Sequence, residues 1–305
     1  MKISVIGAGN VGGLTAMRLA QDGLGDIFLV DIAKGIAQGK AFDMDDSRLL
    51  LKSDFNITGT DDINGISGSD IVIVTAGLAR KPGMTREDLL NKNAQILKDV
   101  CLNIKSLSPQ AIVIIVTNPL DLMTRLALQV TGFAPSKVFG MGITLDASRF
   151  ANLISNELNI PVTEIEPCVI GSHGEGMMPL TRFTKVKGSS LDKIVGSDKA
   201  RELAARTFDR GKEIVSLLGS GSAYFAPSAA IAELAGIIAR GHSRVVGVSA
   251  YLNGEYGIKD VCIGSPCKLG KSGIEKVIEL ELNTEELSSL QACAAKLKEQ
   301  YKEIK

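Results

Sequence analysis

The chain has 305 residues, with 34 basic and 34 acidic side chains and no tryptophan. This length allows roughly two domains and a large buried core. The even charge balance gives no general attraction for nucleic acid or for an anionic membrane, so an anionic ligand would need locally placed arginines. We therefore expect a small-molecule site, with no nucleic-acid and no membrane partner.

Targeting and metal-binding signals are not expected either. No apolar run approaches the roughly 18 residues of a membrane span, and the N-terminus enters a strand instead of a signal peptide, which predicts a cytoplasmic protein. The cysteines are scattered without zinc-ligand spacing, so we predict no metal site and interpret them as buried reduced thiols: Cys101, Cys168, Cys262, Cys267 and Cys293.

The start of the chain carries the clearest motif. Residues 2–6 predict a buried strand, residues 14–22 a helix and residues 27–30 a second strand. The first strand and the helix are joined by a glycine-rich turn of Gly7, Ala8, Gly9, Asn10, Val11 and Gly12. Gly7 permits the sharp turn, Gly9 lets the backbone approach a pyrophosphate, and Gly12 lets the helix pack on its strand. The pattern predicts a dinucleotide site at the helix N-terminus.

Asp31 selects the form of the dinucleotide. It ends the second strand, where an acid would bind the two ribose hydroxyls of NAD and repel the 2′-phosphate of NADP. NAD is therefore the expected cofactor, although Gly35 would not block NADP sterically. The alternative is that Asp31 caps a helix that begins near Ala33.

Strand and helix patterns alternate along the first half. Continuous β-branched runs at residues 70–75 and 111–116, and a short last strand at residues 137–140, indicate strands covered on both faces. The alternation predicts an α/β fold, a Rossmann-type doubly wound parallel sheet whose ligands lie beyond the carboxyl ends of the strands. We expect this domain to span residues 1–141, followed by an α+β substrate-binding domain over residues 142–305.

Two segments leave the expected ligand edge of this sheet. The first, residues 78–86, contains Arg80 and Arg86 and reads as a mobile loop, which we interpret as functional because of its position. Its Thr85 can cap the helix that follows. The second places Asn118 at a strand tip, where ligand contact competes with a role as a helix N-cap.

The second half supplies candidate catalytic side chains. Asp146 and Arg149 lie three apart in a predicted helix over residues 144–158 and share one face, with a plain ion pair as the alternative. His173 lies among glycines, where a ligand has room to approach. The only other histidine, His242, is expected in a surface turn, so His173 is the imidazole available as a general base.

Taken in order, these motifs resemble the lactate/malate dehydrogenase superfamily over essentially the whole chain, and above all its malate dehydrogenases of the lactate dehydrogenase type. Any one motif is modest, and the ordered set is specific. The similarity is carried by residues 7–12, 31, 75–77, 80–86, 117–119, 145–149 and 173–174, with tail segments 221–227 and 251–257.

The resemblance implies hydride transfer between C2 of a 2-hydroxy acid and NAD. His173 would exchange the hydroxyl proton, Asp146 would hold the imidazole, and Arg149 would grip the C1 carboxylate. Arg86 would polarise the C2 oxygen, and Asn118 would contact both substrate and cofactor. Further cofactor contacts implied by the resemblance are Asn93, Val116 and Thr117.

Arg80 decides the expected substrate. In this family the position is typically arginine in enzymes that take a dicarboxylate and glutamine in those that take lactate. Closing the loop over pyruvate would bury an unpaired guanidinium, at a cost of several kcal/mol, whereas the second carboxylate of oxaloacetate would pair with it. We therefore expect malate and oxaloacetate. The alternatives are a lactate or other 2-hydroxy acid dehydrogenase, an NAD-dependent glycosidase and a non-catalytic NAD-binding module.

Three features depart from the common family pattern: Ala79, the order Ala147-Ser148, and Glu175. They bear on rates and loop stiffness more than on the type of reaction. The resemblance also implies a homotetramer or homodimer, with the helix after Asp31 and the C-terminal domain at interfaces, and a place in the tricarboxylic acid cycle.

Overall fold

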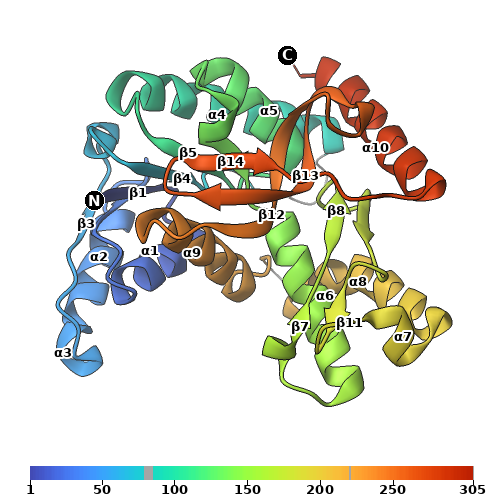
Figure 1. The fold of residues 1–305 in the computed structure, drawn as a ribbon. Helices are drawn as coiled ribbons and strands as arrows, with labels where there is room; N and C mark the ends of the chain where they lie inside the picture. The colour runs from blue at the N-terminus through green and yellow to red at the C-terminus, as the bar shows by residue number, and fades with distance from the viewer. Residues whose placement is uncertain (79–84, 220, 305) are drawn as a thin grey trace.

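The structure is a computed structural model that describes residues 1–78, 85–219 and 221–304. Its first half contains β1 (Lys2–Ile6), α1 (Asn10–Gln21), β2 (Asp26–Val30), α2 (Ile36–Asp46), α3 (Arg48–Leu51), β3 (Ile57–Thr60), β4 (Ile71–Val74), α4 (Arg86–Leu107), β5 (Ile112–Ile115), α5 (Leu120–Thr131) and β6 (Val138–Gly140). These strands pair in parallel in the order β3-β2-β1-β4-β5-β6. The doubly wound α/β prediction is confirmed (Figure 1).

The second half contains α6 (Ile143–Leu158), β7 (Ile165–Glu166), β8 (Val169–Gly171), β9 (Met177–Pro179), β10 (Lys185–Val186), β11 (Ser189–Ser190), α7 (Leu191–Val195), α8 (Ser197–Leu218), α9 (Phe225–Ala239), β12 (Arg244–Asn253), β13 (Lys259–Gly270), β14 (Gly273–Val277) and α10 (Thr284–Lys302). Strands β12, β13, β8 and β9 extend the main sheet beyond β6 in antiparallel pairing. The sheet therefore runs through both halves.

The apolar run over residues 165–170 is divided between two sheets. It splits into β7, which joins a small sheet in the order β11-β10-β7, and β8, which joins the main sheet. Pro167 stands between them and has no N–H to donate to a ladder. The next N–H, that of Cys168, donates instead to the hydroxyl of Thr184 at 3.1 Å.

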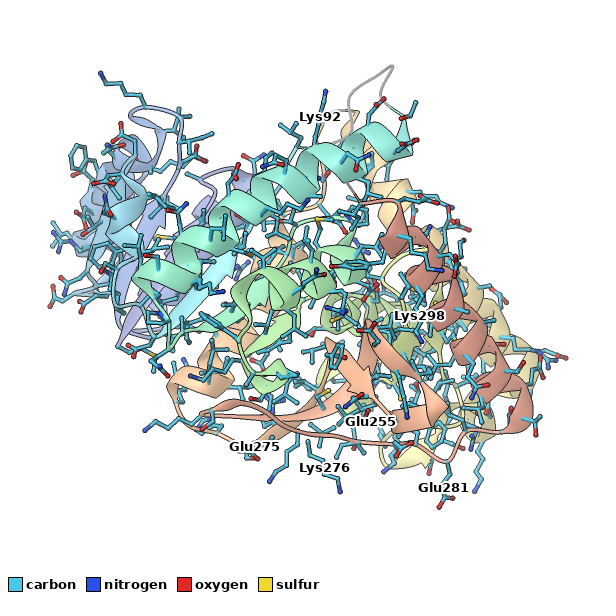
Figure 2. The ribbon with its side chains drawn as sticks, turned by 90° about the horizontal axis from the view of Figure 1, so that it is seen from above. Lys92, Glu255, Glu275, Lys276, Glu281 and Lys298 are labelled. Atoms are coloured by element: carbon cyan, nitrogen blue, oxygen red, sulfur yellow. The ribbon has the colours of Figure 1, made fainter. Side chains whose placement is uncertain are left out.

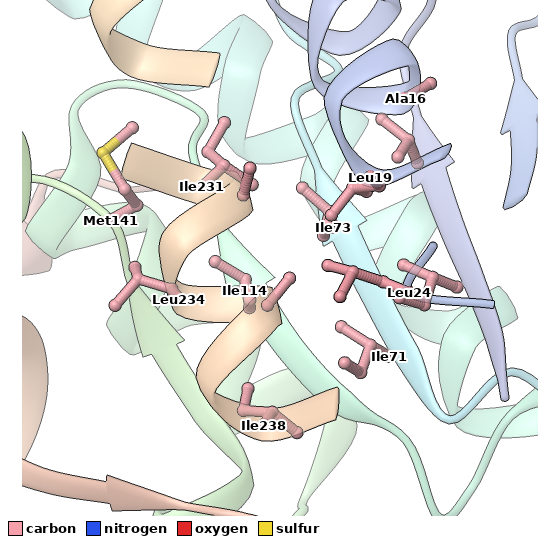
Figure 3. Close-up of a cluster of buried hydrophobic side chains, with 14 of the residues drawn as sticks. Ala16, Leu19, Leu24, Ile71, Ile73, Ile114, Met141, Ile231, Leu234 and Ile238 are labelled. Atoms are coloured by element: carbon pink, nitrogen blue, oxygen red, sulfur yellow. The ribbon is translucent and has the colours of Figure 1, made fainter. Parts of the chain in front are cut away.

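Helix α9 ties the two halves together. Its Ile231, Leu234 and Ile238 are buried in the same cluster as Ile73 of β4 and Leu19 of α1. Figure 3 shows these side chains gathered between α9, α1 and one face of the first-half sheet. The apolar surface buried here holds the N-terminal nucleotide fold against the C-terminal half, because burial is favourable by about 25 cal/mol for each Å² removed from water.

Charged side chains project around the rim of the molecule, as Lys92, Glu275 and Lys276 do in Figure 2, with both signs interspersed. All five cysteines are unpaired, and Cys101, Cys262 and Cys267 are fully buried while Cys168 and Cys293 are partly buried. Across the described residues, no helix is long and apolar enough to span a membrane.

Candidate active site

In the glycine-rich turn, Gly7 and Gly12 are needed for the backbone conformation and for packing, whereas Gly9 borders open space. Gly7 has a φ of +103°, a conformation that L side chains rarely adopt, and a Cβ on Gly12 would lie 1.8 Å from the Gly7 carbonyl oxygen. A Cβ on Gly9, in contrast, would meet no atom within 4 Å. No side chain caps the start of α1, so its first-turn N–H groups face this open side. The cradle is closed at Gly12 and open at Gly9, which fits a diphosphate at the helix N-terminus.

Asp31 and Lys40 hold this cradle from two sides. The Asp31 carboxylate accepts the N–H of Ala8 at 2.6 Å and that of Ala33 at 2.9 Å. It does not cap α2, whose N-cap is Gly35. The ammonium of Lys40 donates to the carbonyl oxygens of Ala8 at 2.7 Å and Gly9 at 3.3 Å. Lys40 was not predicted from the sequence, because nothing in its local pattern distinguishes it from a surface lysine.

The ends of β4 and β5 are cross-braced below the cradle. The buried Thr117 donates its hydroxyl to the carbonyl of Ala76 at 2.6 Å. Asn93 of α4 is also buried, and its amide accepts the N–H of Leu78 at 2.8 Å and donates to the carbonyl of Asn118 at 2.8 Å. The Asn93 side chain therefore holds the backbone at Leu78 and Asn118 in place beside the site.

Asn118 is exposed at the strand tip and lines a cavity beside the catalytic candidates. The N-cap of α5 is Pro119, without a side-chain cap bond, so Asn118 is not the cap. Val116, another expected cofactor residue, follows β5, is partly buried and packs against the hydrophobic cluster that includes α9. Asn118 is thus the side chain at this edge that is placed to reach a ligand.

Helix α6 brings three predicted residues together. Asp146 is fully buried, and its Oδ2 lies 2.7 Å from Nδ1 of His173 while its Oδ1 accepts a hydrogen bond from Nη1 of Arg149 at 3.2 Å. A carboxylate only accepts, so Nδ1 carries the hydrogen and Nε2 is left to exchange protons with a ligand. The predicted Asp146–Arg149 ion pair exists, and the same carboxylate also orients the imidazole.

Glycines let these groups approach closely. A Cβ on Gly142, which precedes α6, would lie 2.8 Å from Cβ of His173, and a Cβ on Gly211 of α8 would lie 3.3 Å from Nη1 of Arg149. His173 follows β8 in the loop before β9, and His242 is exposed in a turn as expected. The fold therefore isolates one imidazole at the site.

The electrostatics favour a charged imidazole. Burial opposes the charge, but Asp146, and more weakly Asp121, outweigh it and raise the pKa of His173 above its usual value, while Arg149 opposes them. Burial also raises the pKa of Asp121 to about 6, although its hydrogen bond from Ser249 acts in the other direction. The two carboxylates thus favour the protonated form of His173.

Asp121 was not predicted from the sequence. It lies in the first turn of α5, 4 % exposed, and accepts the backbone N–H of His173 at 2.9 Å and the hydroxyl of Ser249 at 2.6 Å. Ser249 comes from β12, more than a hundred residues further along the chain. No local pattern reveals a contact at that separation.

A cavity of about 670 Å³ opens beside His173. It is bounded by the start of α4, by α5, by the loop before β9 and by α10, whose contributions include Cys293 and Lys296. Glu175, one of the departures from the family pattern, lines it and pairs with Lys296 at 3.8 Å. The loop that carries His173 thus meets α10 across this cavity.

The two predicted substrate arginines of the loop fall outside the description. Arg80 lies outside the described residues, as does the side chain of Arg86, whose backbone begins α4. Ala79, one of the departures from the family pattern, also lies outside them. Thr85 is the N-cap as predicted, and it forms a capping box with Asp88 at 3.0 and 3.1 Å. Among the described residues no group of three possible metal ligands is found.

Comparisons with known proteins agree with this arrangement. Residues 1–140 match the family model described as lactate/malate dehydrogenase, NAD binding domain, and residues 143–305 match that described as lactate/malate dehydrogenase, alpha/beta C-terminal domain. A malate dehydrogenase from Methanosarcina mazei is 49 % identical over 92 % of each chain.

Solved structures of the same kind superpose over nearly the whole chain. Malate dehydrogenase from Salinibacter ruber is 39 % identical with a TM-score of 0.94, covering 99 % of this chain and 97 % of that one. A lactate dehydrogenase from Cryptosporidium parvum, solved with lactic acid and nicotinamide adenine dinucleotide, is 37 % identical with a TM-score of 0.94, covering 99 % and 96 %. The overall backbone therefore does not separate the two substrates.

Proposed function

The chain belongs to the lactate/malate dehydrogenase family, and from this we propose that it catalyses the reversible NAD-dependent oxidation of (S)-malate to oxaloacetate. The observation that carries the proposal is the buried Asp146, which bonds His173 with one oxygen and Arg149 with the other. A non-catalytic NAD-binding module would not require a buried carboxylate that orients both an imidazole and a guanidinium.

We propose that His173 is the proton acceptor in malate oxidation. Its Nε2 takes the hydroxyl proton because Nδ1 is held by Asp146 at 2.7 Å, and the same carboxylate stabilises the resulting imidazolium. NAD, when bound, supplies the acceptor for the hydride that leaves C2. In reduction His173 returns the proton to the keto oxygen.

Substrate binding falls to the cations and to Asn118. Arg149 presents a planar guanidinium suited to two parallel bonds to the C1 carboxylate. Arg86 polarises the C2 oxygen, and Asn118 contacts substrate and cofactor at the strand tip. Arg80 pairs with the second carboxylate, a role supported by the residue type at this loop position and by relatives named malate dehydrogenase.

The proposed NAD site consists of residues 7–12, Asp31 and the ends of β4 and β5. The open position at Gly9 and the carboxylate of Asp31 support it. Asn93, Val116 and Thr117 belong to it, and the buried amide of Asn93 acts through the Leu78 and Asn118 backbone. We assign residues 1–141 to cofactor binding and residues 142–305 to catalysis.

Assembly and cellular role are further parts of the proposal. Exposed apolar side chains gather on α2 and α3, where Phe42, Leu49 and Leu50 are 68 %, 86 % and 83 % exposed. Such surface is typical of an interface, and supports a homotetramer or homodimer with α2 and the C-terminal domain at the contacts. We also propose a cytoplasmic enzyme of the tricarboxylic acid cycle.

The substrate test compares oxaloacetate with pyruvate by NADH absorbance, in the wild type and in Arg80→Gln. We expect oxaloacetate to be preferred in the wild type and the preference to fall by roughly a thousandfold in the variant, because an unpaired buried charge costs several kcal/mol. Lys81→Gln, which removes the neighbouring cation, is the matched control and should keep the preference.

Two outcomes would contradict the proposal. If the wild type prefers pyruvate, the enzyme is a lactate dehydrogenase and the assignment of Arg80 is wrong. If NADH binds but neither oxaloacetate nor pyruvate is reduced, the catalytic assignment of His173 is wrong and the chain is an NAD-binding module.

A further inference from the structure

A second carboxylate reaches His173 from a different helix. Asp121 Oδ2 accepts the His173 backbone N–H at 2.9 Å, and its Oδ1 accepts the hydroxyl of Ser249 at 2.6 Å. Both hydrogen-bonding oxygens are therefore occupied by fixed donors from two other segments. Asp121 is 4 % exposed and Ser249 is fully buried, so these bonds lie in a poorly solvated region.

Among the described side chains that bond to His173 or to its partners, two carboxylates, Asp121 and Asp146, face one guanidinium, that of Arg149. Asp146 is paired with the guanidinium of Arg149 at 3.2 Å, which leaves the charge of Asp121 without a cationic partner among its hydrogen bonds. Protonation of His173 neutralises this remaining charge. Within the described part of the chain, the charged groups that face the site are Asp121 on α5, Asp146 and Arg149 on α6, Glu87 on α4, Lys296 and Glu303 on α10, and Glu175 in the His173 loop.

We propose that Asp121 is a positioning residue for the proton acceptor: it anchors the His173 loop through the backbone, and its negative charge stabilises the imidazolium. This inference rests on the proposed role of His173. It assigns the two carboxylates different tasks, since Asp146 fixes the ring and its tautomer while Asp121 fixes the loop and balances the charge. Over pH 7–9 Asp121 is ionised, because its pKa is about 6.

Replacement of Asp121 by asparagine separates the charge from the hydrogen bonds. The Asn oxygen can still accept the His173 N–H, and its NH2 group can donate to the Ser249 oxygen, so the loop stays anchored. Loss of the charge should lower the pKa of His173 by about one pH unit, the usual scale for a close opposite charge. Asp99→Asn, which removes an exposed carboxylate on α4, is the matched control and should leave it unchanged.

The chain has only two histidines, so ring proton NMR can follow His173 directly, with the exposed His242 signal as an internal reference. We expect the His173 midpoint in Asp121→Asn to fall and the acid limb of kcat/KM for malate to move to lower pH by the same amount. NADH affinity should stay within about twofold, because Asp121 does not line the cofactor cradle. A purely structural role would leave the midpoint in place.

An unchanged His173 midpoint in folded Asp121→Asn overturns the proposal. If that variant does not fold, Ser249→Ala tests the same interaction, because removing the hydroxyl disfavours ionised Asp121 and should lower the His173 midpoint by a smaller amount. An unchanged midpoint there also overturns it. The NMR titration needs no turnover. A wild type that fails to oxidise malate would therefore contradict the proposed function, and the effect of Asp121 on the His173 midpoint would still be tested independently.

Discussion

At the scale of residues, the site depends on how one buried carboxylate divides its two oxygens. Asp146 has no exposed surface, and each oxygen meets one partner, Nδ1 of His173 or Nη1 of Arg149. Removing either partner would leave part of a buried charge uncompensated, at a cost of several kcal/mol. The proposed proton acceptor and the proposed substrate clamp are therefore coupled, and a change at one should alter the position of the other.

The raised pKa of His173 sets opposite pH dependences for the two directions. Malate oxidation needs the neutral ring, so its kcat/KM should rise as the pH rises through this pKa, whereas oxaloacetate reduction needs the imidazolium and should fall. Each limb should follow a single titration, and in the free enzyme the midpoint of His173 should lie above the ordinary value of about 6.5. Initial rates from pH 5 to 9 test this, and His173→Asn should remove both limbs together with activity. Limbs that run in the same direction with pH for oxidation and reduction would contradict a single proton-exchanging group.

At the scale of elements, the glycine turn makes a prediction that separates packing from binding. Gly12→Ala should destabilise the protein strongly, because the new Cβ would lie 1.8 Å from the Gly7 carbonyl oxygen. Gly9→Ala should leave the melting temperature nearly unchanged, because nothing lies within 4 Å of its Cβ, and should weaken NADH binding by roughly tenfold or more by filling the space for the pyrophosphate.

Thermal unfolding and NADH fluorescence titration measure the two effects. Gly39→Ala in α2 is the control, since its Cβ also meets no atom within 4 Å and it lies outside the turn. Unchanged NADH affinity in Gly9→Ala would mean that the cofactor diphosphate does not lie against this backbone.

Elements with local signals were predictable, and those fixed by distant contacts were not. Helix α4 begins at Arg86, directly after the predicted cap Thr85, because Thr85 and Asp88 form a capping box within three residues. The division of 165–170 between two sheets depends on which strands lie beside it, which the sequence does not state. The same limit hid Asp121, whose hydrogen-bond partners lie 52 and 128 residues away.

At the scale of the whole molecule, the two halves share one core instead of meeting at a hinge. Ile231 and Leu234 of α9 pack with Ile73 and Ile114 of the nucleotide sheet, and the sheet continues from β6 into β12. The cofactor edge and His173 are thereby held on one framework.

The exposed apolar side chains of α2 and α3 lead to the last prediction. Leu49 and Leu50 of α3 are 86 % and 83 % exposed, next to Phe42 of α2 at 68 %. Burying these side chains against a second copy would be favourable by about 1.5–3 kcal/mol each, and a buried lysine there would oppose association. The double variant Leu49→Lys, Leu50→Lys should therefore have a lower mass by light scattering after size exclusion, in the micromolar range.

Leu102→Lys is the matched control, because Leu102 is 55 % exposed on α4 and lies outside this patch. It should keep the wild-type mass. A double variant of unchanged mass would place the interface elsewhere, and a monomeric wild type would refute the homo-oligomer itself. Because α2 and α3 directly follow Asp31, loss of the contact should also weaken NADH binding, whereas a patch unrelated to assembly would leave both mass and affinity as they are.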